Sequence, residues 1–139
     1  MDVTRGSYRA GLRVTLRSTA AAYGYTLTIA ATAAEVMTVH GKPATGELFL
    51  FVAGGLAAFA TLEVVLQATR PAAGDAPHHA FPFAGALNVV SVPTGLGVAT
   101  GVSHAVTSSL AWLLSPMVAT AAYLLLVALQ LTVVDAVRG

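Results

Sequence analysis

Few side chains in this chain of 139 residues have the chemistry of a functional site, and the most prominent of them is Glu63. It stands inside a long apolar stretch, with Gln67 one helical turn later and Arg70 beyond it. Ionisable groups are costly in lipid, so each one indicates either a partner or a function. A desolvated carboxylate can bind and release a proton or a cation. The structural alternative is that Glu63 pairs with Arg17, Arg70 or the hydroxyl of Tyr23.

Two further ionisable groups, Glu35 and His104, fall near the predicted outer ends of two apolar stretches. An ion pair or hydrogen bond between them would join the first stretch to the third. The alternative is a proton relay, although one pair supplies only one step of such a relay. Both interpretations require that the two residues be neighbours.

Several classes of site are excluded or disfavoured by composition. The chain has no cysteine, which excludes disulfides, zinc-thiolate sites, iron–sulfur clusters and thiol catalysis. A net charge of +1 offers no basic surface, so we expect no nucleic-acid partner. Adjacent His78 and His79 beside Asp75 suggest a metal, but neighbouring histidines point apart, and we expect a solvated loop. We expect no enzyme, no metal and no cofactor.

The elements that would position these residues are predicted to be membrane helices. Hydrophobic residues make up 56% of the chain and charged residues 9%, well below the quarter or so that soluble domains carry. Four apolar stretches are each long enough to cross a bilayer. The predicted fold is all-α, with four transmembrane helices arranged as two antiparallel hairpins in one bundle. The bundle is predicted to be a single domain of residues 18–138, with spans at about 18–38, 48–68, 85–106 and 110–134.

Positive charge predicts the orientation. Residues 1–17 form a basic amphipathic lead-in with an arginine at every fourth position from Arg5 to Arg17. Arg70 and Arg138 would share its side, and Lys42 would lie opposite. This asymmetry predicts the inner (plasma) membrane, with both termini cytoplasmic. The alternatives are a voltage-sensor-like arginine series and a signal peptide cleaved after the first apolar run.

Small residues predict where the helices pack. Gly24, Gly54, Gly97 and Gly101 lie on small-residue stripes, and the last two form the G-x-x-x-G pattern of close-packed membrane helices. Val36 is expected on the opposite, lipid-facing side of the first helix. Pro93 and nearby glycines leave open an interrupted third helix of the kind that transporters use.

Two functions follow from these observations. The first is a structural or accessory role, in which small helix faces pack against another copy of the chain or against other membrane subunits in the lipid bilayer. The alternative is a small oligomeric transporter or channel for protons, cations or a small solute, with Glu63, Glu35 and His104 as its polar path.

Overall fold

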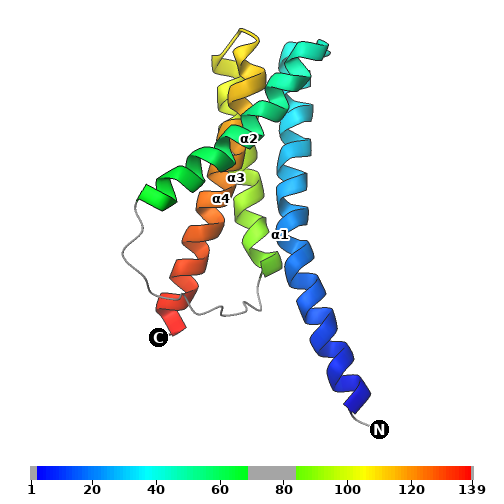
Figure 1. Cartoon of the computed structure of the whole chain (residues 1–139). Coiled ribbons are helices and arrows are strands. Elements are labelled where there is room, and N and C mark those ends of the chain that lie inside the picture. Colours follow the sequence, from blue (N-terminus) through cyan, green and yellow to red (C-terminus); the bar gives the residue numbers. More distant parts are fainter. Residues whose placement is uncertain (1–2, 69–83, 139) are drawn as a thin grey trace.

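The chain folds into a bundle of four α-helices (Figure 1). The computed structural model describes residues 3–68 and 84–138. The helices are α1, Val3–His40; α2, Thr45–Ala68; α3, Ala84–Ala105; and α4, Leu110–Arg138. An all-helical bundle was predicted, and the helix bounds lie close to the predicted ones from α2 onward.

Helix α1 differs from its prediction because the basic lead-in is part of it. The helix has 38 residues, which at about 1.5 Å per residue exceeds the thickness of a hydrocarbon core. Its N-terminal part extends past the other helices (Figure 1). The first proline of the chain is Pro43, so no proline ends the helix near Arg17. The lead-in and the first predicted span are therefore one continuous helix.

The end of α1 depends on a glycine. Gly41 has a φ of +82°, and its N–H donates to the carbonyl of Met37 at 2.9 Å. Side chains other than glycine rarely adopt this left-handed conformation, which is the common way for a helix to stop. The chain then reverses over residues 41–44 into α2.

Helix α3 is continuous across Pro93, so the predicted alternative of an interrupted helix is wrong for this structure. Proline has no N–H to donate to the carbonyl four residues earlier, which belongs to Val89. Both residues lie on the exposed side of α3. A missing bond there disturbs no contact between helices.

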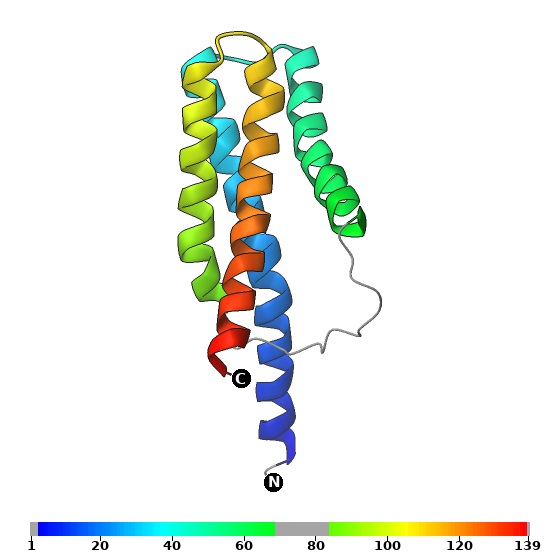
Figure 2. The ribbon, with the colours of Figure 1, turned by 90° about the vertical axis from the view of Figure 1, so that its left-hand side faces the viewer.

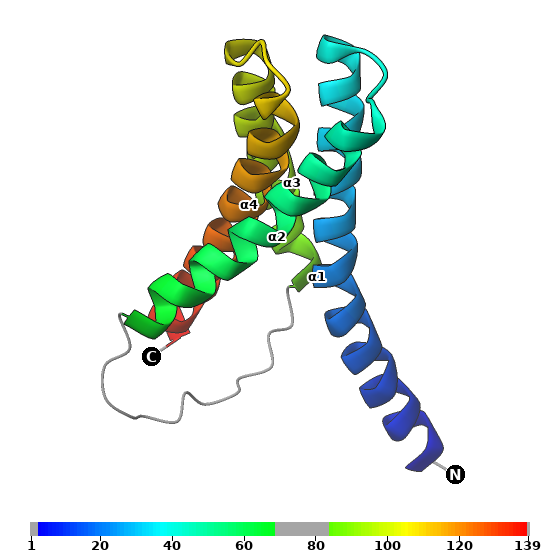
Figure 3. The same ribbon diagram turned by 45° about the horizontal axis from the view of Figure 1, so that its top comes forward.

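The arrangement of the helices departs from two packed hairpins. Helix α4 contacts the other three helices, and α3 packs between α1 and α4 (Figures 2 and 3). Helix α2 packs mainly against α4, although a short loop joins α1 to α2, and it meets α1 where the Tyr25 ring lies edge-on to Phe59. In the tight first hairpin that the sequence predicts, Thr28 would lie level with Ala58, and the structure departs from that hairpin. Gly54 explains the preference, because it lets α2 meet the backbone of α4 at Leu113.

The buried faces recur at every fourth residue and consist mainly of small side chains. Such a spacing lets the ridges of one helix fit the grooves of the next. Buried positions with this spacing are Gly24, Thr28, Thr32 and Val36 on α1; Gly54 and Ala58 on α2; Ser91, Gly95, Ala99 and Ser103 on α3; and Ala111, Ser115, Ala119 and Tyr123 on α4, which also buries Trp112, Pro116 and Thr120.

Two predictions about packing within the chain differ from the structure. Val36 is fully buried, although it was expected on the side suited to lipid or to a looser contact. Gly97 and Gly101 are exposed, and a Cβ added at either would meet nothing within 4 Å. On α3 the glycine that packs inside the chain is Gly95, where an added Cβ would lie 3.1 Å from the Ala119 carbonyl oxygen. The α3 face is thus rotated from the predicted one.

Among the described residues, two helices are long and apolar enough to cross a membrane, over Thr45–Val65 in α2 and Leu110–Gln130 in α4. Four spans were predicted. Helices α1 and α3 carry many threonine, serine and glycine residues, which lower their hydropathy without adding charge.

Candidate functional site

The structure places Glu35 and His104 side by side, as one of the two sequence interpretations required. The Oε1 atom of Glu35 lies 3.5 Å from Nε2 of His104. The pair joins α1 to α3 near the end of the bundle that carries the loop 41–44. The Glu35 side chain is 26% exposed and that of His104 is 64% exposed, so the pair is open to its surroundings. Such partly exposed pairs stabilise a fold only modestly.

Two more contacts tie the same end of the bundle. Nε2 of His40 donates to the carbonyl oxygen of Ser103 at 2.8 Å, which links the end of α1 to α3. The Glu47 carboxylate accepts from the Ala44 N–H at 2.8 Å and from the Ser109 hydroxyl at 3.2 Å. Glu47 therefore caps α2 and also holds the turn between α3 and α4. The contact between Glu47 and Ser109 was not predicted from the sequence.

A second polar group lies between α3 and α4 toward the opposite end. The Tyr123 hydroxyl donates to Oδ1 of Asn88 at 2.8 Å, and the Ser91 hydroxyl donates to Oε1 of Gln130 at 3.2 Å. Hydrogen bonds of this kind join membrane helices. Gly24 of α1 lies against this group, because an added Cβ would overlap the Asn88 amide.

This polar group was missed by sequence reasoning, although a signal existed. Asn88 and Ser91 stand three residues apart, and Tyr123 and Gln130 stand seven apart, so each pair occupies one face of its helix. Two polar faces on consecutive antiparallel helices predict a contact.

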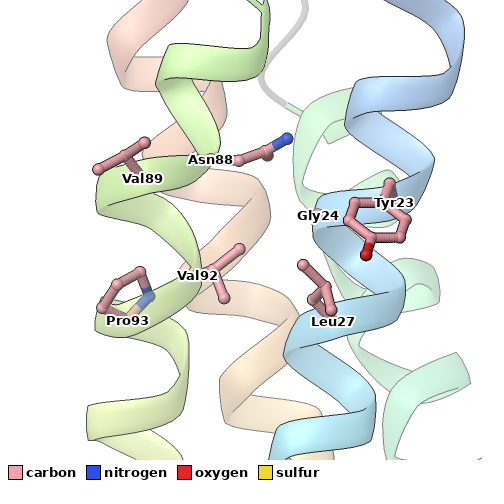
Figure 4. A pocket seen from close by; sticks show the side chains of 7 residues that line it. All are labelled: Tyr23, Gly24, Leu27, Asn88, Val89, Val92 and Pro93. Atoms are coloured by element: carbon pink, nitrogen blue, oxygen red, sulfur yellow. The ribbon is translucent and has the colours of Figure 1, made fainter.

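A groove of about 450 Å³ opens between α1 and α3 next to this group (Figure 4). Asn88 points from α3 toward Gly24 on α1 (Figure 4). The rest of the wall is mostly apolar. The lining residues are Tyr23, Gly24, Leu27, Asn88, Val89, Val92 and Pro93. Oδ1 of Asn88 is already joined to α4 through Tyr123, so apart from the Tyr23 hydroxyl the groove offers mainly apolar surface.

Glu63 lies on the exposed side of α2 and accepts a hydrogen bond from Nε2 of Gln67 at 3.2 Å. Tyr23 lines the α1–α3 groove and is 62% exposed, so it is not the partner of Glu63. Arg70 lies outside the described residues, and pairing with Arg17 stays a prediction.

The three predicted pathway residues do not share one site. Glu63 stands five residues before the end of α2, and Glu35 stands five residues before the end of α1. Because α1 and α2 run in opposite directions, the C-terminal part of α2, which carries Glu63, lies away from the end of the bundle that holds the loop 41–44 (Figure 1).

Among the described residues, no group of three histidine, aspartate or glutamate side chains could hold a metal ion. The sequence motif of His78, His79 and Asp75 lies outside them. Comparison with protein-family models, with curated proteins and with solved structures finds no match to this chain.

Proposed function

We propose that this chain is a small integral membrane protein with four spanning helices and a structural or accessory role, as a subunit that packs against other copies or other membrane proteins. The membrane placement is supported by α2. Only 17% of the apolar window within its Thr45–Val65 stretch is buried, unlike the core helix of a soluble protein, which is mostly buried. Its exposed side includes Phe49, Val52 and Leu56.

Helices α1 and α3 are proposed to span together with α2 and α4. Helix α3 has 22 residues, about 33 Å, which matches a hydrocarbon core. Helix α3 packs along α4, which is itself long and apolar enough to cross a membrane. The hydroxyls of Thr28 and Thr32 on α1 donate to carbonyls of their own helix at 2.9 and 2.8 Å, so this buried face presents few polar groups.

The packing role rests on one observation, which is the exposure of Gly97 and Gly101. Both face away from the bundle, with open space beyond them. The G-x-x-x-G pattern allows close approach of another helix, and within this chain no described helix uses it. A helix that packs there has to come from another molecule.

Substitution of Gly101 tests this role. Gly101→Leu fills the outward face without touching another helix of the same chain, so the fold should persist while the complex dissociates. Native mass spectrometry after extraction in mild detergent measures the assembly, and helical circular dichroism measures the fold. Ala60→Leu, at an exposed alanine of α2, is the matched control. A wild-type chain that is monomeric in these conditions and carries no partner would contradict the role.

The alternative function is a small transporter or channel for protons or cations. Glu63 favours it, because this carboxylate lies in the wall of a groove between α2 and α4. Proteoliposome flux assays separate the two functions. Flux that is present in the wild type and lost in Glu63→Gln would support transport, whereas absence of flux in a well-folded assembly favours the packing role.

A further inference from the structure

The groove between α2 and α4 differs from the α1–α3 groove because a carboxylate forms part of its wall. Its volume is about 500 Å³, which is within the range of small-molecule sites. Helix α2 leans away from α4 toward its Ala68 end (Figures 1 and 2). Glu63 and Gln67 of α2 line this divergent part together with apolar side chains, among them Leu62 of α2 and Leu125 of α4.

A carboxylate in a mostly apolar wall favours a positively charged occupant. A carboxylate at an apolar wall attracts a cation more strongly than one in water does, because the lower dielectric screens it less. The Gln67 amide donates a single hydrogen bond to Oε1, and a carboxylate has capacity for several. The apolar remainder of the wall requires that the rest of the occupant be apolar as well.

We propose that this groove binds a cationic amphiphile, with its positive group against the Glu63 carboxylate and its apolar body between Leu62 and Leu125. The inference rests on the proposed membrane placement, which would open the groove sideways to the bilayer. The shared chemistry is a cation attached to an apolar body. Its source is either a free lipophilic cation or the ammonium headgroup of a lipid.

Binding of radiolabelled tetraphenylphosphonium tests the proposal, with the full chain in nanodiscs of an uncharged glycolipid, whose headgroup carries no ammonium, and empty discs as background. We expect saturable binding that Glu63→Gln weakens by about tenfold or more, equivalent to about 1.4 kcal/mol. Glu63→Asp should retain part of the affinity. Glu35→Gln removes a carboxylate at the opposite end of the bundle and should leave the affinity unchanged.

A second pair of variants tests the groove independently of charge. Leu125 and Leu129 are 56% and 58% exposed on α4, but only Leu125 lines the groove. Leu125→Trp should block binding and Leu129→Trp should not. Because both positions are exposed, neither change is expected to unfold the chain, and circular dichroism checks this.

Discs that contain phosphatidylethanolamine identify the source of the cation. A lower tetraphenylphosphonium affinity of the wild type in these discs than in discs of the uncharged glycolipid alone means that the lipid ammonium competes for Glu63. An unchanged affinity means that the site prefers a free cation. Equal binding by wild type and Glu63→Gln, or by wild type and empty discs, would overturn the proposal. The oligomer measurement with Gly101→Leu is independent of this result, so the two failures are distinguishable.

Discussion

At the scale of single residues, small side chains determine how closely the helices approach. Gly54 is the clearest case, since an added Cβ would overlap the Leu113 carbonyl oxygen and lie 3.0 Å from Cγ of Pro116. The carbonyl belongs to the backbone of α4 and cannot rotate away. Gly54→Ala therefore has to separate α2 from α4.

We expect Gly54→Ala to lower the free energy of unfolding by about 1–3 kcal/mol, the usual cost of overpacking. Chemical or thermal unfolding in detergent, followed by circular dichroism, measures it. Gly46→Ala, on the same helix, is the matched control, because a Cβ there meets nothing within 4 Å. This control should be neutral or slightly stabilising, since alanine is the better helix former. Equal effects of the two changes would contradict the close approach at Gly54.

At two buried hydroxyls of α4, by contrast, we expect a substitution to stabilise the fold. Oγ of Ser115 and Oγ1 of Thr120 are buried without a hydrogen-bond partner in the part of the chain that the structure describes. A buried polar atom without a partner costs about 1–3 kcal/mol. Thr120→Val keeps the shape of the side chain and removes that atom, so it should raise the free energy of unfolding by about 1 kcal/mol. Thr61→Val is the control, because the Thr61 hydroxyl is exposed and donates to the Ala57 carbonyl. If Thr120→Val instead lowers the free energy of unfolding, the hydroxyl makes a stabilising interaction in the folded protein.

At the scale of elements, the sequence predicts the number and length of the helices better than their facing sides. Apolar length, prolines and glycines mark where a helix can run and end, and the observed bounds agree with them from α2 onward. The sides by which the helices pack were harder to predict. Helix α3 has small residues on two stripes, one with Gly95 and Ala99 and one with Gly97 and Gly101. Lipid is as apolar as a helix surface, so exposing either stripe carries little penalty. Contacts with α1 and α4 decide between them.

Among the candidate polar residues, one contact could be predicted from the sequence and another could not. The proximity of Glu35 and His104 was predictable, because two costly groups at one depth gain from meeting. The partner of Glu63 was not predictable, since choosing Tyr23 assumed that α2 packs along α1. In the structure α2 packs on α4, which separates those two side chains.

Cross-linking tests that neighbour relation, and the absence of native cysteine makes every introduced pair unique. An added Cβ at Gly55 lies 4.0 Å from Oγ1 of Thr120, which is within reach of a disulfide once both are cysteine. Gly55→Cys with Thr120→Cys should oxidise readily and shift mobility on a denaturing gel. Thr28→Cys with Ala58→Cys, the pair of the packed-hairpin arrangement, should remain reduced. Efficient oxidation of the second pair alone would restore the hairpin and reject the observed packing.

At the scale of the whole molecule, the alternating directions of four helices bring the loop 41–44 and the turn 106–109 to one end of the bundle (Figure 1). If all four helices span, as proposed, both connections lie on one side of the membrane and residues 69–83 join α2 to α3 on the other. The arginine asymmetry assigns that other side to the cytoplasm. Single cysteines at Lys42, Thr107 and Asp75 test this arrangement, with a membrane-impermeant maleimide added to intact cells.

We expect Lys42→Cys and Thr107→Cys to react in intact cells, because both positions are exposed at the outer end. Asp75→Cys should react only after the membrane is permeabilised. The reverse pattern would keep four spans and invert the orientation. Labelling of Asp75→Cys and Lys42→Cys from the same side would be incompatible with a spanning α2, because an odd number of crossings separates the two positions when α2 crosses the bilayer. That result would leave α2, the most apolar and least buried helix, without the lipid that its exposed phenylalanine, valine and leucine side chains require.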